Sequence, residues 1–175
     1  MNTLTRWMIG LALLTTLAGP ARADREPVGG VCVPDSDTIA RQLHHTAGFG
    51  VQFAPGKTGR IRLLCPLLGN NDTELGGIAL SSIDPDGMGT GAHVVASLHR
   101  ARKGTNVWIN IGSCDSNTSN ATGPTEVWCG FPKRDLSHDE YYWWEIIIER
   151  TNPALNVEFL GVMLLYQPGG LPWPW

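Results

Sequence analysis

The sequence is poor in charged residues and has no excess of basic ones. Charged residues make up 17% of the 175 residues, and the formal net charge at pH 7 is −3. A protein that binds nucleic acid presents a basic stripe to the phosphate backbone, whereas the basic residues here gather only in the stretch RARK at 100–103. We interpret this stretch as the end of a strand that runs into a turn, and we expect no nucleic-acid partner.

Long apolar runs are absent beyond the N-terminus. The run WMIGLALLTTLAG at 7–19 follows the basic residue Arg6 and precedes ARA at 21–23, the small-x-small pattern of a signal-peptidase site. It is shorter than the roughly 20 residues that a membrane span needs. We therefore predict a signal peptide over residues 1–23 and an exported mature chain, periplasmic or extracellular, without a membrane span.

Motifs for catalysis and for zinc binding are missing as well. The sequence has no GxSxG nucleophile elbow, no CxxC pair and no cysteine at zinc-ligand spacing from a histidine. Glu145 and Glu149 would lie about 13 Å apart on an extended strand, further than the roughly 5–10 Å of a glycosidase pair. We name no catalytic residue and favour a non-catalytic function, with a hydrolase of unrecognised site as an alternative.

The histidines do not form a metal-binding set. His93 and His99 share one strand face but are six residues apart, about 20 Å along an extended strand, and the adjacent His44 and His45 point to opposite sides. We interpret all four as surface or edge-strand residues.

From residue 49 onward no apolar period of 3.6 residues is sustained, which argues against helices. Short apolar runs alternate instead with Gly, Pro, Asn and Asp, the pattern of strands separated by turns. We predict an all-β fold, a two-sheet antiparallel β-sandwich of jelly-roll type with about eight strands. The predicted strands are Gly50–Ala54, Arg60–Leu68, Gly77–Asp84, His93–Ala101, Asn106–Ser113, Glu126–Phe131, Tyr141–Arg150 and Val157–Tyr166.

The predicted organisation is one domain with short flanking segments. Residues 24–48 form an N-terminal segment, in which Asp35–His45 is predicted to hold one short helical turn. Residues 49–167 form the sandwich, and residues 168–175 form a tail rich in Pro and Trp.

Alternation within the predicted strands separates inward from outward faces. The inward sets are Tyr142, Trp144, Ile146 and Ile148; Ile61, Leu63, Cys65 and Leu67; Val94, Ala96 and Leu98; and Val107, Ile109 and Ile111. The runs 141–150 and 157–166 are apolar on both faces, which predicts central strands or an outer face that is covered, for example by a second subunit.

Four cysteines in an exported chain predict two disulfides. Three pairings are open, and we favour Cys32–Cys65 with Cys114–Cys129, because the second pair brackets the polar loop DSNTSNATGPT and would tie the ends of two neighbouring strands. A link over about 15 residues stabilises a fold by roughly 3 kcal/mol.

The stretch DPDGMGTGA, which begins at Asp84, contains a candidate calcium site. Asp84 and Asp86 begin like an EF-hand loop, but Val95 stands where the closing Glu belongs. We favour a glycine-rich strand connection with a positive φ at Gly87 or Gly89. A calcium site at the rim of the sandwich stays open as the alternative, and no other cofactor is expected. The carboxylates that another loop would supply to it are Asp72, Glu74 and Asp115.

Aromatic residues give the best indication of function. Tyr141 and Trp143 are predicted to point away from the core beside Glu145, an arrangement in which rings stack on a sugar while the carboxylate accepts its hydroxyls. Trp173 and Trp175 end a Pro-stiffened tail, which we expect to dock on a sheet face or a neighbour. These five residues predict a non-catalytic binding module for a carbohydrate or cell-surface glycan. The alternative is a structural protein that forms a homo-oligomer through its aromatic face.

Several segments together resemble a known group of proteins. They are the signal peptide, CVP, IRLLCPL, SSIDPDG, VVASLHRA, YYWWEIIIER and VEFLGVMLLY. Over most of the mature chain the sequence resembles a group of small exported, functionally uncharacterised bacterial proteins. The resemblance implies a disulfide-bearing β-sandwich in the bacterial periplasm or outside the cell, and it transfers no catalytic residue.

Overall fold

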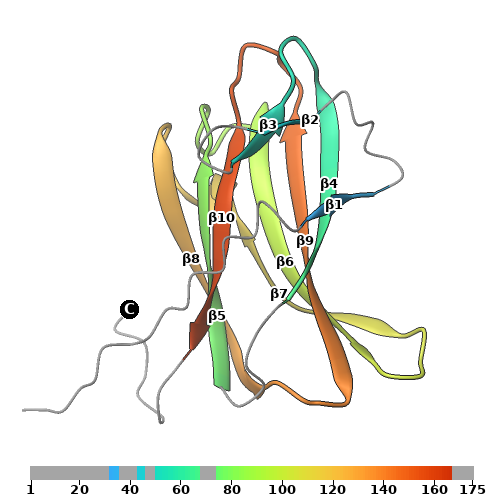
Figure 1. Ribbon diagram of the computed structural model, residues 1–175. Coiled ribbons are helices and arrows are strands. Elements are labelled where there is room, and N and C mark those ends of the chain that lie inside the picture. Colours follow the sequence, from blue (N-terminus) through green and yellow to red (C-terminus); the bar gives the residue numbers. More distant parts are fainter. Residues whose placement is uncertain (1–31, 36–42, 46–49, 68–73, 167–175) are drawn as a thin grey trace, which may run out of the picture.

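The computed structural model of the protein describes residues 32–35, 43–45, 50–67 and 74–166. These residues form two antiparallel sheets packed face to face, which confirms the predicted all-β sandwich (Figure 1). The predicted signal peptide and the Pro/Trp tail lie outside the described residues. Within the described part of the chain, no helix has the length and apolar character needed to cross a membrane.

The two sheets contain five strands each. Sheet A has the order β1-β4-β9-β6-β7 and sheet B the order β2-β3-β10-β5-β8. The strands of sheet A are β1 (Val33–Pro34), β4 (Gly59–Pro66), β9 (Glu140–Arg150), β6 (Ala92–Arg102) and β7 (Trp108–Asp115). Those of sheet B are β2 (Leu43–His45), β3 (Val51–Phe53), β10 (Glu158–Tyr166), β5 (Glu74–Ile83) and β8 (Pro124–Asp135). A single 3-10 turn among the described residues, η3 (Ser116–Thr118), follows β7.

All eight predicted strands are present. Two short strands that the sequence does not predict, β1 and β2, come from the segment placed outside the sandwich. The predicted helical turn is wrong at its end, because Leu43–His45 is a strand that pairs with β3; the rest of it, 36–42, lies outside the described residues. Pairing with β3 satisfies backbone groups that one isolated helical turn would leave to water.

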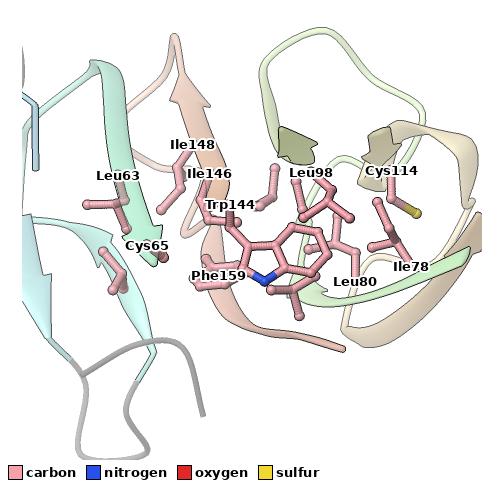
Figure 2. Close-up of a cluster of buried hydrophobic side chains, with 14 of the residues drawn as sticks. Leu63, Cys65, Ile78, Leu80, Leu98, Cys114, Trp144, Ile146, Ile148 and Phe159 are labelled. Atoms are coloured by element: carbon pink, nitrogen blue, oxygen red, sulfur yellow. The ribbon is translucent and has the colours of Figure 1, made fainter. Parts of the chain in front are cut away.

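The core lies between the sheets. Strands β9 and β10 occupy the middle of sheets A and B, as their apolar residues on both faces predict. Trp144, Ile146 and Ile148 of β9 are buried in one cluster with Phe159 of β10 (Figure 2). Burial of each such side chain stabilises the fold by about 1.5–3 kcal/mol. The other inward residues confirmed as buried are Ile61, Leu63, Cys65, Val94, Ala96 and Leu98.

One predicted inward set is wrong. Val107 is 66% exposed and Ile109 is 47% exposed, and only Ile111 packs partly against the core. The hairpin of β6 and β7 projects sideways from the sandwich, away from sheet B (Figure 1), and a register shift in its pairing sets Ile109 opposite Arg100. Val107, Ile109 and Arg100 therefore border an open pocket of about 480 Å³ rather than the core.

Both favoured disulfides are confirmed. Cys32–Cys65 fastens the segment at edge strand β1 to β4 of the same sheet. Cys114–Cys129 joins β7 to β8, which are edge strands of different sheets, so this bond cross-links the sandwich. Two disulfides are consistent with an exported protein, because disulfides persist in oxidising compartments.

Arg150 closes the end of the sandwich where β9 turns towards β10. The residue is 3% exposed, and its guanidinium donates to the backbone carbonyls of Lys57, Ala54 and Leu155. It also lies 4.7 Å from the centre of the Phe53 ring. Burial lowers the pKa of Arg150 from its ordinary value, and the three carbonyls compensate the buried charge.

We expect Ile148→Ala to lower the free energy of unfolding by about 2–5 kcal/mol, because it leaves a cavity in the core. Ile109→Ala, the same substitution at an exposed position of the same sheet, should cost less than about 1 kcal/mol. Urea denaturation of the two variants measures the difference. Equal losses would place Ile109 in the core after all.

Candidate functional site

The outer face of sheet A carries aromatic side chains in register with polar ones. The three rows of neighbouring residues across β9, β6 and β7 are Tyr141, Ala101 and Trp108; then Trp143, His99 and Asn110; then Glu145, Ser97 and Ser113. Side chains two residues apart share a strand face, and the register shift between Leu98 and His99 brings Ser113 onto the face of Asn110. All nine side chains therefore point to the same side of the sheet, away from the core.

Three rings from three neighbouring strands form a cluster on this face. The His99 ring stacks on the Trp143 ring with centroids 5.5 Å apart and an interplanar angle of 20°. The Trp108 ring meets His99 edge-on, at 5.1 Å and 76°. Trp108 is 59% exposed and Tyr141, on the neighbouring row, is 61% exposed. We call Tyr141, Trp143, His99 and Trp108 the aromatic platform; two of its rings present a large surface to solvent.

Glu145 connects the platform to basic side chains. Its Oε2 lies 2.9 Å from Nε2 of His99, and its Oε1 accepts a hydrogen bond from the guanidinium of Arg62 on β4. Arg62 also pairs with Asp35 at 3.2 Å. The hydrogen bond to Glu145 raises the pKa of Arg62 above its ordinary value. Both carboxylate oxygens of Glu145 therefore have protein partners, and this residue orients the His99 ring.

His99 is the central residue that the sequence reasoning missed. It is 3% exposed and lies on β6, between β9 and β7, so its interpretation as a surface or edge-strand residue is wrong. Its Nδ1 finds no hydrogen-bond partner among the described residues. The sequence already places His99 on the outward face of its strand, but the stacking depends on its register with Trp143.

Polar groups continue the face beside the platform. The Oγ atoms of Ser97 and Ser113 lie 2.8 Å apart, and Nδ2 of Asn110 donates to Oγ of Ser113 at 2.9 Å. Asn110 and Ser113 are exposed. Aromatic surface next to hydroxyl and amide groups is suited to a ligand with apolar C–H faces and many hydroxyls.

Three of the five predicted ligand-binding residues, Tyr141, Trp143 and Glu145, share this face of β9. Trp173 and Trp175 are outside the described residues. Glu149 shares the outer face of β9 but forms an ion pair with Arg60 and lies 3.7 Å from Nε2 of His93. The charged side chains at this end of the face therefore pair with one another.

Asp84 and Asp86 lie in the connection from β5 of sheet B to β6 of sheet A, at the opposite end of sheet A from the platform. The positive φ predicted at Gly87 or Gly89 is found at Gly87, at +60°. Ser116 donates a hydrogen bond of 2.5 Å to Oδ2 of the fully buried Asp84. Burial raises the pKa of Asp84 to about 6; the Ser116 hydrogen bond opposes this rise and the neighbouring Asp86 carboxyl adds to it.

We expect Glu145→Gln to lower the free energy of unfolding by roughly 1–3 kcal/mol, because the amide keeps the shape but removes the charge that Arg62 contacts. Glu149→Gln is the matched control on the same strand and face. Its ion pair with the exposed Arg60 contributes roughly 0–1 kcal/mol. Urea denaturation compares the two, and an equal loss in both variants would contradict the positioning role of Glu145.

Comparison with known proteins bears on the fold. No protein-family model matches the chain, and no curated protein matches it. A solved structure described as the xylan-binding module CBM15 is 12% identical, with a TM-score of 0.51, and the match covers 83% of this chain and 97% of that one.

Two weaker structural matches carry similar descriptions. One is CBM29_1, a family 29 carbohydrate-binding module from Piromyces equi, with 15% identity and a TM-score of 0.38 over 82% of this chain and 85% of that chain. The other is a carbohydrate-binding module of family 29, with 12% identity and a TM-score of 0.30 over 73% of this chain and 79% of that chain. The comparisons show that this chain shares the β-sandwich fold of the xylan-binding module.

Proposed function

We propose that the protein is an exported, non-catalytic binding module that holds a carbohydrate chain against the outer face of sheet A. The observation that carries the proposal is the aromatic platform, in which the His99 ring lies between Trp143 and Trp108. The fold shared with a xylan-binding module supports it. So does the pairing of Glu145 and Glu149 with basic side chains, because it leaves these carboxylates bound to neighbours rather than poised for acid–base chemistry.

The two most exposed rings of the platform are spaced for a short oligosaccharide. Tyr141 on β9 and Trp108 on β7 both pair with Ala101 of β6, so about two strand spacings, roughly 10 Å, separate their strands. The small side chain of Ala101 leaves room between the rings. The ammonium of Lys103 lies 5.5 Å from the centre of the Tyr141 ring and holds it by a cation–π contact.

The two less exposed members of the platform, the buried His99 and the half-buried Trp143, have a different part in binding. His99 covers one face of the Trp143 ring, and Glu145 holds His99. Rings whose orientation is already set by neighbours lose little conformational entropy when a ligand binds. Trp143 and His99 therefore support the exposed Trp108, and Asn110 and Ser113 offer polar groups for the hydroxyls of the ligand.

We expect the native protein to bind at least one member of a panel of soluble polysaccharides, with xylan as the first probe because of the fold comparison. Trp108→Ala and Tyr141→Ala should each weaken this binding about tenfold or more, since exposed aromatic rings at a binding surface contribute upwards of about 1.4 kcal/mol. Affinity electrophoresis and calorimetry measure the change.

Trp128→Ala is the matched control for that experiment. Trp128 lies on β8 of sheet B and is 47% exposed, so its loss should leave the affinity for polysaccharide unchanged. Undiminished binding by the two platform variants, or an equal effect of all three substitutions, would remove the platform as the binding surface.

The alternative is a homo-oligomer that buries the same face. It is favoured by two further exposed apolar residues of sheet A, Val33 and Leu64, which pair with each other across β1 and β4. Light scattering of the native protein gives its mass. A dimer that Trp108→Ala dissociates, without polysaccharide binding, would assign the platform to assembly; a monomer would exclude this function.

A further inference from the structure

The connection between β5 and β6 contains buried oxygen atoms that the binding face does not use. Asp84 is fully buried, and its Oδ1 finds no hydrogen-bond partner among the described residues. The same holds for the buried Oδ1 atoms of Asp86 and Asn117. Buried polar atoms in native proteins nearly always have a partner. A shared proton would satisfy the neighbouring Asp84 and Asp86 carboxyls, whereas a cation would satisfy all three oxygens.

Protein contacts bring these oxygens to the same end of the sandwich. Ser116 donates its hydroxyl to Oδ2 of Asp84 at 2.5 Å, and Asn117 is the next residue of the η3 turn. A Cβ on Gly87 would lie 3.2 Å from the backbone oxygen of Asn120. The β5–β6 connection and the loop between β7 and β8 are therefore in direct contact, and Asn120 presents a carbonyl to the same region.

The glycines of DPDGMGTGA make room for one carboxylate. A Cβ on Gly89 or on Gly91 would collide with Oδ2 of Asp86, and the backbone N–H of Gly91 donates to that oxygen at 2.8 Å. The backbone thus wraps around one side of the carboxylate and holds it in place. Its other oxygen, Oδ1, is the one without a hydrogen-bond partner in the part of the chain that the structure describes.

A further buried hydroxyl precedes this connection. Ser82 is fully buried, and its hydroxyl has no hydrogen-bond partner among the described residues. It stands two residues before Asp84 on the inner side of β5, because alternate residues share a face. A hydroxyl within reach of a carboxylate oxygen would donate to it, so we do not count Ser82 among the ligands of the site.

We propose that this end of the sandwich binds a calcium ion through the Oδ1 atoms of Asp84, Asp86 and Asn117. Calcium takes six to eight oxygen ligands in flexible geometry and accepts carboxylates, amide and backbone carbonyls and water together. Zinc sites use Cys and His, and neither residue type is among these three ligands. The set has two carboxylates, fewer than the three His, Cys, Asp or Glu side chains that no group of the described residues provides, so backbone carbonyls and water would complete it. The ion links the β5–β6 connection, where the chain passes from sheet B to sheet A, to the loop between β7 and β8.

The test is the effect of calcium alone on the stability of the whole mature protein. After chelation with EGTA, millimolar CaCl₂ at neutral pH should raise the melting temperature by about 5 °C or more when calcium exceeds its Kd about 100-fold. Calorimetric titration with CaCl₂ should show one binding site, and MgCl₂ should give a smaller shift, because magnesium requires a stricter octahedral geometry.

Two variants and one control locate the site. Asp86→Asn keeps an oxygen for the Gly91 N–H but loses the charge, and should abolish the calcium shift; Asn117→Ala should weaken calcium binding at least tenfold. Asp139→Asn, which removes an exposed charge at the other end of sheet A, should leave the shift intact. Absence of both shift and binding heat, or an equal shift in Asp86→Asn, would overturn the proposal and leave a proton shared between the two carboxyls.

Discussion

Every side chain of the central strand β9 lies either in the core or on the outer face of sheet A, because successive residues of a β-strand point to opposite sides of the sheet. Inward, Trp144, Ile146 and Ile148 pack against Phe159 of the other sheet. Outward, the same strand supplies Trp143 and Glu145 to the candidate site. A strand held by close packing on one side gives the rings on its other side a rigid support, which a surface loop would not provide.

The two ends of the sandwich are built differently. At one end Arg150 bonds to three backbone carbonyls, and Cys114–Cys129 links the sheets just before the η3 turn, where the proposed calcium ion would act on the same loop. At the other end the β6–β7 hairpin projects from the sandwich, with Val107 exposed. The exposed rings of the platform lie towards this end.

The sequence predicts most of the strands, since these follow from residue spacing along the chain. It leaves three cysteine pairings open and favours the pairing that the structure shows. The sequence-based prediction fails where the register of strand pairing decides which side chains are buried. Ile109 has the right alternation for the core, but the shift in the β6–β7 ladder sets it opposite Arg100, in the hairpin that projects from the sandwich. Strands β1 and β2 are too short to show a period, and they exist because β4 and β3 offer them unpaired backbone groups.

By itself, the sequence determined the fold class, the inward face of β9 and the outward direction of Tyr141, Trp143 and Glu145, because the period of two is a property of consecutive residues. Only the tertiary structure placed His99 against Trp143 and Ser116 against Asp84. These pairs are 44 and 32 residues apart in the sequence. Their contact depends on which strands become neighbours and in which register, and this is decided by the packing of the whole chain rather than by any local pattern.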